Sequence, residues 1–354
     1  MSSISPARDV AARVLKRVEQ GGYASDALRV DSTALAARDA ALAEAIVLGS
    51  LRYQAQLDYL IAFYAGRPQP KLDPEVLIAL RMGIYQLRYL DRIPSHAAVT
   101  ESVELVKQSK KKSASGFVNA VLRKVNREPV KWPDRATELS VPGWMLERWD
   151  RHYGKEIAEG IARAALEEPE AYVNPATGRQ QDIGAQSIVP LLDLRAGMIL
   201  LDLCAAPGNK TAQAVEQGAR VIACDRYLRR LEEVNSTVER VVLDATDALP
   251  FSRKFDRILV DAPCSGTGTL GHNPEIKWRL KPGDPEVFAV RQREMLERAM
   301  ELLAPGGKLV YSTCALESEE NENAVAGFDV METHVRIPGR EPGDGFFAAV
   351  ITST

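Results

Sequence analysis

Two cysteines follow apolar segments at positions where a thiol can react. Cys264 lies in the run Asp-Ala-Pro-Cys-Ser-Gly after the apolar segment 258–261, and Cys314 ends the run Tyr-Ser-Thr-Cys after the segment 309–312. Near-continuous apolar runs of this length are typical of parallel strands that are buried on both faces. The carboxyl ends of such strands share one edge of the sheet, where ligands bind. We therefore predict that both thiols lie in one crevice.

Further apolar runs that end in acids, at 198–202, 221–225 and 241–244, complete a predicted α/β sheet. The first of these runs leads into a loop of small residues and then a predicted helix, which lets a ligand approach the backbone and the helix N-terminus. Asp225, roughly 20 residues further on, is placed to accept hydrogen bonds from a ribose diol, and Asp244 to meet an adenine. These features predict a cofactor that contains adenosine. The predicted binding loop consists of Cys204, Ala205, Ala206, Pro207, Gly208, Asn209 and Lys210.

Simpler interpretations of these residues stay open. The loop is also compatible with a sharp βα turn, and Asp225 with a helix cap. A dinucleotide would require the pattern G-x-G-x-x-G to seat its pyrophosphate, and the loop has only Gly208. S-adenosylmethionine has no phosphate and needs only access to the backbone, so we expect this cofactor.

A thiol beside a methyl donor is suited to methylation at carbon 5 of cytosine. That carbon becomes nucleophilic only after a thiolate has added to carbon 6 of the ring. A carboxyl group near ring nitrogen 3 favours the addition, and Asp261 is the candidate for this role. The base must be flipped out or single-stranded to reach such a pocket. The other two cysteines, Cys204 and Cys224, are interpreted mainly as small buried hydrophobic residues.

The bulk composition is that of an ordinary globular protein. The chain has 354 residues, of which 45% are hydrophobic and 26% charged, and its net charge is −3. This charge predicts no general attraction to nucleic acid, so any RNA contact must come from local basic patches. No run of about 18 apolar residues predicts a membrane span, and no signal peptide is predicted, so we expect a cytoplasmic protein that does not bind membranes.

Helical periodicity dominates the first third of the chain. Apolar residues recur at three and four residues through Val10, Val14 and Val18, and Asp73-Pro74 predicts the start of another helix. We predict an all-α domain over residues 1–128, a linker with a small connecting domain over 129–185, and an α/β catalytic domain over 186–354. A helical pair is expected within the connecting domain, around 145–153 and 156–166.

The residues from Leu201 to Glu320 strongly resemble the Sun branch of the Nop2/Sun RNA 5-methylcytosine methyltransferases. The loop 204–210, the acids Asp225 and Asp244, the run 261–266, and Ser312-Thr-Cys314 with its following acids match the motifs of that family. The resemblance implies a Rossmann-like, S-adenosylmethionine-dependent domain. It also implies that Cys314 is the nucleophile and that Cys264 assists release of the methylated product.

The first helices resemble the NusB-type RNA-binding domain, particularly at 48–53, 81–87, 93–99 and 116–123. The resemblance implies a cytosine of small-subunit (16S) ribosomal RNA as the substrate. The chain departs from the family in two respects. Asn209 stands where a second glycine is usual, and the segments near 172–179, 231–238 and 326–344 are shorter than the family pattern.

Basic residues predict where RNA is held. The run Lys110, Lys111 and Lys112, together with Arg123, is predicted to contact phosphates, although a solvated helix face is the simpler interpretation. Lys277 and Trp278 are predicted to clamp RNA near the target base, with core packing as the alternative for Trp278. The histidines and cysteines show no spacing of metal ligands, so we expect no metal. We also expect a monomer.

Other classes of protein stay open at this point. An RNA adaptor without turnover would not require both thiols and Asp261. A DNA cytosine methyltransferase would use the Pro-Cys thiol, Cys264, as its nucleophile. A dehydrogenase is disfavoured because the glycine pattern is absent.

Overall fold

The computed structural model describes residues 4–68 and 71–353, so residues 1–3, 69–70 and 354 of the predicted domains lie outside the described part. By their contacts the residues form two compact units. The first contains Met1–Leu146, Ala165–Glu167 and Leu270–Arg279; the second contains Glu147–Ala164, Glu168–Thr269 and Leu280–Thr354. Residues 129–185 are divided between the units, and the three-part division stays a prediction.

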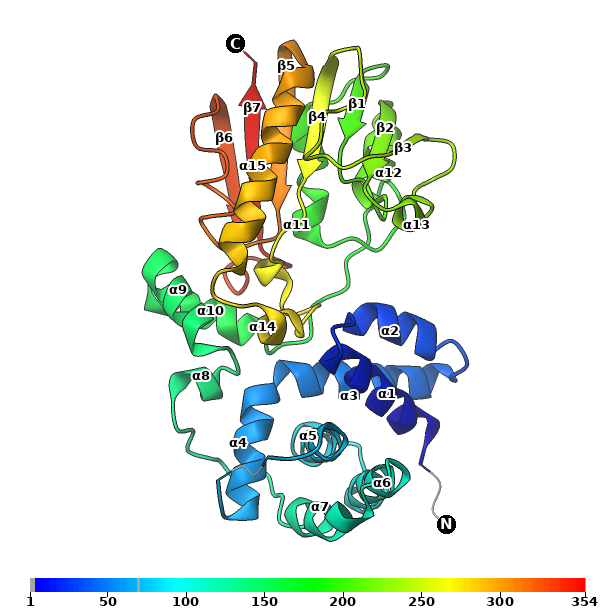
Figure 1. Ribbon diagram of the computed structural model, residues 1–354, viewed down its shortest axis with the longest axis vertical. Coiled ribbons are helices and arrows are strands. Elements are labelled where there is room, and N and C mark those ends of the chain that lie inside the picture. Colours follow the sequence, from blue (N-terminus) through cyan, green and yellow to red (C-terminus); the bar gives the residue numbers. More distant parts are fainter. Residues whose placement is uncertain (1–3, 69–70, 354) are drawn as a thin grey trace. The chain divides into compact units, whose positions relative to one another are not determined.

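The first unit is helical, as the periodicity predicted (Figure 1). Helix α5 shows why these residues form helices: Pro74 occupies its first turn, and Val76, Leu80 and Ile84 form its buried stripe. Helices α3 and α5 pack so closely at Gly49 that a Cβ atom there would lie 1.9 Å from Cζ of Tyr85. Only glycine fits this position without a shift of its neighbours. The helices of this unit are α1 Pro6–Glu19, α2 Ala24–Asp31, α3 Ala37–Arg52, α4 Gln54–Ala65, α5 Pro74–Tyr89, α6 Ser95–Gln108, α7 Ser115–Leu122, α8 Arg135–Glu138 and α14 Ile276–Arg279.

The second unit contains a seven-stranded sheet in the order β3-β2-β1-β4-β5-β7-β6. Strands β1 to β5 pair in parallel, whereas β7 is antiparallel to both β5 and β6. The strands are β1 Ile199–Asp202, β2 Arg220–Asp225, β3 Glu239–Val242, β4 Phe255–Asp261, β5 Leu303–Thr313, β6 Val330–Arg336 and β7 Phe346–Thr352. This is the predicted Rossmann-like arrangement, with two strands that the sequence analysis did not assign.

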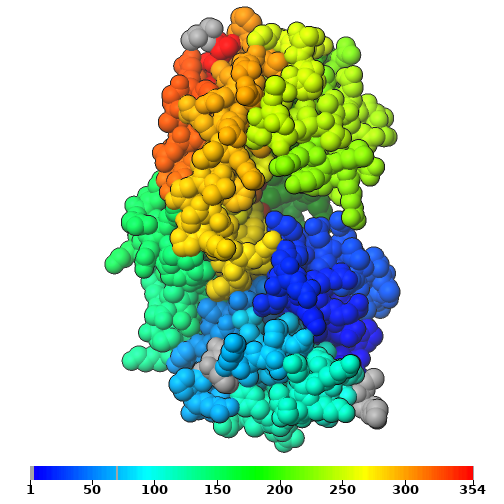
Figure 2. Space-filling model, in the orientation of Figure 1, coloured from blue at the N-terminus to red at the C-terminus, as the bar shows by residue number. Residues whose placement is uncertain are grey.

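Alternating residues of the strands build one core on each face of the sheet. Ile258 and Val260 pack on the side of α15 Asp284–Leu302, while Leu259 packs on the side of α12 Asn209–Glu216. Figure 1 shows α15 in front of the sheet, and in Figure 2 its yellow-orange atoms cover the strands behind it. The remaining helices are α9 Gly143–Tyr153, α10 Lys155–Ala164, α11 Ile183–Gln186 and α13 Leu228–Leu231. Within the described ranges, no helix is long and apolar enough to cross a membrane.

Candidate active site

The two predicted reactive thiols lie side by side. Cys264 follows β4 and Cys314 follows β5, and these strands are parallel neighbours in the sheet. The Sγ atoms are 3.2 Å apart, and the backbone N–H of Cys314 donates to Sγ of Cys264 at 3.3 Å. The hydrogen bond with Cys314, together with burial, raises the pKa of the Cys264 thiol well above its usual range. Cys264 therefore binds a proton firmly.

Asp261 forms a charged pair beside these thiols. Its Oδ2 accepts a hydrogen bond from Nζ of Lys210 at 2.6 Å, and its Oδ1 accepts one from Oγ of Ser312 at 2.7 Å. Burial lowers the pKa of Lys210, but the adjacent Asp261 carboxylate outweighs this effect, so the net pKa is raised. Lys210 is therefore an ammonium, 5.5 Å from the ring centre of Phe346 at the start of β7. The loop that was predicted to bind the cofactor and the end of β5 thus meet at Asp261.

The loop that was predicted to bind the cofactor makes a tight connection between β1 and α12. Gly208 has φ +101°, a conformation that L side chains rarely adopt, and a Cβ atom there would lie 3.2 Å from Cα of Val234. Ala205 donates its N–H to the carbonyl of Cys224 at 2.8 Å. Helix α12 begins directly at Asn209, so the loop presents backbone groups at a helix N-terminus, as expected.

The two acids predicted to hold the cofactor lie after β2 and β3. Oδ1 of Asp225 accepts from the N–H of Tyr227 at 2.9 Å, and Tyr227 is itself the N-cap residue of α13, which has no side-chain cap, so Asp225 is not the cap of this helix. Its Oδ2 lies 4.0 Å from Nη1 of Arg230, too far for a hydrogen bond, and can accept from a ligand. Asp244 accepts from the N–H and Oγ1 of Thr246 and pairs with Arg226 at 3.2 Å.

Asp202 was not assigned a role from the sequence, yet it is the buried acid at the end of β1. Its Oδ2 accepts from Oγ1 of Thr211 at 2.7 Å, whereas its Oδ1 has no protein partner among the described residues. Burial raises the pKa of Asp202 to about 7. The available signal was its position, because an acid that ends a buried strand must face the ligand edge.

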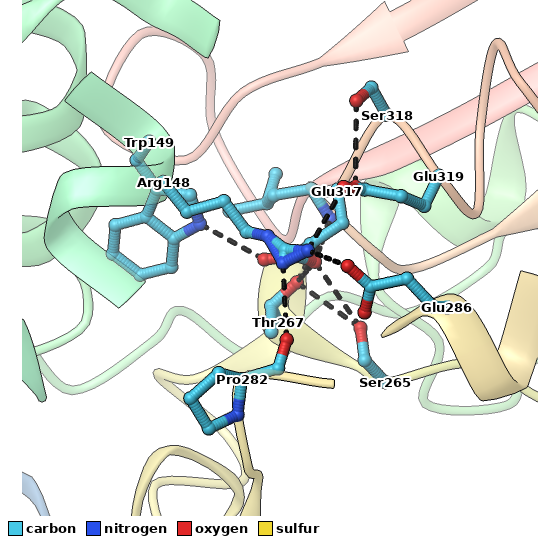
Figure 3. Close-up of polar contacts among 10 residues, drawn as sticks. Arg148, Trp149, Ser265, Thr267, Pro282, Glu286, Glu317, Ser318 and Glu319 are labelled. Carbon is cyan, nitrogen blue, oxygen red and sulfur yellow. Dashed lines mark hydrogen bonds and ion pairs between the residues drawn. The ribbon is translucent and has the colours of Figure 1, made fainter. Parts of the chain in front are cut away.

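Two glutamates after Cys314, Glu317 and Glu320, tie the cysteine loops together, and Figure 3 shows the contacts of Glu317. Glu317 accepts hydrogen bonds from Trp149, Ser265 and Thr267. Oε2 of Glu320 accepts from the N–H of Ser265 at 2.8 Å, and burial raises its pKa to about 7. The sequence analysis treated these acids only as parts of a motif.

The predicted RNA contacts have different outcomes. Lys110, Lys112 and Arg123 are exposed, while Lys111 is partly buried and pairs with Asp73 at 3.1 Å. The prediction for Lys277 is wrong in this structure: its side chain is fully buried and its Nζ donates to the carbonyl of Arg52 at 2.8 Å.

Trp278 lies in the same segment as Lys277. Its Nε1 donates to the carbonyl of Leu51 at 2.7 Å, which agrees with the packing alternative for this residue.

The sheet order and the site after its strands define a class of protein, the Rossmann-like methyltransferases. The sequence profile of the family described as 16S rRNA methyltransferase RsmB/F matches residues 189–337, and that of the NusB family matches residues 5–127. The crystal structure of PH0851 superposes with a TM-score of 0.79 over 99% of this chain and 100% of that chain, at 21% identity, which supports the fold.

Two curated relatives are similar over nearly the whole chain. Ribosomal RNA small subunit methyltransferase B of Yersinia pseudotuberculosis is 32% identical over 97% of this chain and 98% of its own. The probable methyltransferase B of Bacillus subtilis is 30% identical over 91% and 87%. The chain belongs to the RsmB/F methyltransferase family, with an N-terminal NusB domain.

Both alignments, over 391 and 420 positions, are longer than the chain, so these relatives contain internal segments that it lacks. The cofactor of this methyltransferase is S-adenosylmethionine, as predicted. The loop 204–210 and Oδ2 of Asp225, which lies 4.0 Å from Nη1 of Arg230, suit a ligand with a ribose diol and no phosphate.

Proposed function

We propose that this protein methylates carbon 5 of a cytosine in small-subunit ribosomal RNA, with Cys314 as the nucleophile. The observation that carries the proposal is the pair of thiols, 3.2 Å apart at the ends of β4 and β5, beside the Lys210–Asp261 pair. The substrate class is inferred from the relatives, which are named as methyltransferases of small-subunit ribosomal RNA.

In the proposed reaction, the Cys314 thiolate forms a bond to carbon 6 of the ring. Ring nitrogen 3 takes a proton from the Lys210–Asp261 pair, which prevents charge from building up on the base. S-adenosylmethionine supplies the methyl group to carbon 5. A base then takes the proton from carbon 5, the carbon–sulfur bond breaks with the assistance of Cys264, its electron pair returns to Cys314, and nitrogen 3 gives its proton back to the Lys210–Asp261 pair.

The roles of the two cysteines differ in this scheme. The raised pKa of Cys264 keeps this thiol protonated, so it does not compete with Cys314 for carbon 6, and we propose that it assists release of the methylated product. Loss of Cys264 should therefore leave the covalent RNA adduct in place, whereas loss of Cys314 should prevent the adduct from forming.

The experiment uses small-subunit ribosomal RNA carrying tritium at carbon 5 of cytosine, with wild type, Cys314→Ala and Cys264→Ala. Cys224→Ala is the matched control, because this thiol is buried within β2. We expect wild type and the control to release tritium to water and to form 5-methylcytosine. Cys314→Ala should do neither, and Cys264→Ala should give an adduct that survives a denaturing gel.

Other outcomes overturn the scheme. Methylation by Cys314→Ala but not by Cys264→Ala would make Cys264 the nucleophile, as in the DNA methyltransferase alternative. RNA and cofactor binding without any methylation by wild type would favour the adaptor.

Exposed basic residues of the NusB domain are proposed as the positioning contacts for this RNA. Lys110, Lys112 and Arg123 are suited to phosphates, which fix position but not sequence. A cytoplasmic location and a monomeric state stay predictions.

A further inference from the structure

We propose that Glu317 is a positioning residue that holds the two cysteine loops at their reacting distance. The proposal deepens the proposed function, because it concerns the reaction of Cys264 and Cys314. Glu317 lies three residues after Cys314, and its side chain is only 2% exposed. Figure 3 shows its carboxylate at the centre of a set of polar groups from three separate segments.

The carboxylate of Glu317 joins the loop after β4 to the loop after β5. On the first loop, Oγ of Ser265 donates to Oε2 at 3.3 Å, and Oγ1 of Thr267 also donates to this atom. On the second loop, the N–H of Leu316 donates to Oε2 at 3.1 Å. Ser265 directly follows Cys264, so one oxygen atom fixes both chain segments that carry the thiols.

The other carboxylate oxygen fixes this arrangement to helix α9. Nε1 of Trp149 donates to Oε1 of Glu317 at 3.2 Å, and this indole is one of the largest fully buried side chains of the protein. One turn further along α9, Tyr153 donates its OH to the carbonyl of Leu316 at 2.7 Å. The Cys314 loop is therefore held from a helix, which is a more rigid support than another loop.

Arg148, the neighbour of Trp149, secures the same helix from its other side. Its Nη2 pairs with Glu286 at 2.5 Å and with Glu319 at 2.9 Å. Glu286 lies in the first turn of α15, and Glu319 lies two residues after Glu317. Helix α9, the start of α15 and the Cys314 loop are thus joined around the buried carboxylate.

The requirement at this position is for a group that only accepts hydrogen bonds. Four donors face the carboxylate, namely an indole N–H, two hydroxyls and a backbone N–H. An amide keeps one acceptor but turns an NH₂ group toward other donors, and an apolar side chain leaves all four donors without an acceptor. Since a shift of 1 Å at a reacting group lowers a rate by about a hundredfold, small movements of these loops are sufficient to slow the reaction.

The experiment measures how fast the two thiols form a disulfide in the absence of RNA, because this rate depends on how close they are held. Diamide removes one hydrogen from each of two thiols and joins the sulfurs, while its N=N bond is reduced to a hydrazine. We expect wild type to form a disulfide between Cys264 and Cys314, detected by mass spectrometry of the linked peptides. Glu317→Gln should form it about tenfold more slowly and Glu317→Leu more slowly still. Glu322→Gln, which changes an exposed glutamate of the same segment, should react as wild type does.

Turnover is measured on the same variants. We expect kcat to fall by about tenfold in Glu317→Gln and by about a hundredfold in Glu317→Leu, with the KM for S-adenosylmethionine unchanged. Partial activity in Glu317→Gln is expected because the glutamine side chain retains one oxygen that accepts hydrogen bonds. If Glu317→Leu does not fold, Thr267→Val removes one donor from the opposite loop and should slow disulfide formation in the same direction.

The proposal is overturned if folded Glu317→Leu, or Thr267→Val in its place, forms the disulfide and turns over at wild-type rates. It is equally overturned if wild type forms no disulfide between these cysteines. A wrong assignment of the nucleophile gives a different pattern, because disulfide formation would still depend on Glu317 while the effects of the cysteine variants on methylation would be exchanged.

Discussion

Gly268 is the residue at which one added methyl group should disturb the site most. It lies on the loop after Cys264, donates its N–H to the carbonyl of Cys314 at 2.8 Å, and its carbonyl accepts from the N–H of Gly345 at 2.8 Å. A Cβ atom at this position would lie 2.5 Å from the carbonyl oxygen of Gly345 and 2.8 Å from that of Cys314. Both neighbours are backbone atoms, so neither can turn away as a side chain would.

The expected cost of Gly268→Ala follows from these distances. An ordinary contact begins at 3.4 Å, so the backbone of Gly345 must move by about 0.9 Å. Such overpacking costs about 1–3 kcal/mol, and weakening the hydrogen bond to Cys314 costs about 1 kcal/mol more. The lower entropy of the unfolded alanine chain returns about 0.4–1 kcal/mol. We expect the free energy of unfolding to fall by about 2 kcal/mol.

The activity should fall further than the stability, because the displaced carbonyl belongs to Cys314 itself. The carbonyl of Cys314 must move by about 0.6 Å to reach an ordinary contact, and since a misplacement of about 1 Å lowers a rate by about a hundredfold, we expect kcat to fall by at least about tenfold. Denaturant unfolding gives the stability, and methylation of ribosomal RNA under conditions where the variant is fully folded gives kcat. Gly283→Ala is the matched control, since a Cβ atom at Gly283 meets nothing within 4 Å and its φ is −94°.

A folded Gly268→Ala protein with the stability and kcat of the Gly283→Ala control would refute this reasoning. The space between the two loops would then not be restricted by the backbone, and the close approach at Gly268 would have no part in positioning Cys314.

Three further predictions concern charge. Burial raises the pKa of Glu320 from 4.5 to about 7, so between these pH values the folded protein holds a proton that the unfolded chain has lost. The free energy of unfolding should therefore fall by up to about 3 kcal/mol as the pH rises from 4.5 to 7. Glu320→Gln should remove this part of the pH dependence in denaturant titrations at pH 4 to 8. Burial, with a smaller contribution from a neighbouring arginine, lowers the pKa of Lys277 from 10.5 to about 7, so its contribution to stability should increase as the pH rises from about 7 to 10.5. Lys277→Met should abolish that increase, and an unchanged pH profile of unfolding would contradict the burial of an ammonium. Replacing Lys110, Lys112 and Arg123 with alanine should weaken RNA binding and reduce the dependence of log K on log salt by up to about two to three units, while an unchanged slope would show that these side chains do not contact phosphates.

The sequence predicted the parts of the fold that depend on burial. Strands β1, β2, β4 and β5 are apolar runs because both their faces are covered, and the shared edge of parallel strands was enough to bring Cys264 and Cys314 together. Strand β6 escaped prediction because it lies at the edge of the sheet, where most of its residues are exposed and no apolar run is needed. Strand β3 is the opposite edge, and it begins earlier than its apolar residues indicated.

Local sequence patterns could not predict contacts between segments that lie far apart in the chain. Trp149 and Glu317 are 168 residues apart, and nothing in either segment indicates the other. Lys277 was interpreted as an RNA contact because it lies just past the loop of Cys264, whereas its partner in the structure is a backbone carbonyl, a group that every residue possesses. Such a partner leaves no trace in the sequence.

The position of β7 also has a consequence for biosynthesis. This strand is translated after the segments that carry both cysteines, yet it pairs directly with β5. The N–H of Gly345, just before β7, also donates to the carbonyl of Gly268 on the Cys264 loop. A nascent chain therefore exposes the unpaired side of β5 until β7 has left the ribosome, and an unpaired strand edge of this kind is prone to aggregate. The proposed site is complete only when β7 has paired with β5, so a chain truncated before β7 would carry every side chain proposed to be catalytic and still lack an assembled site.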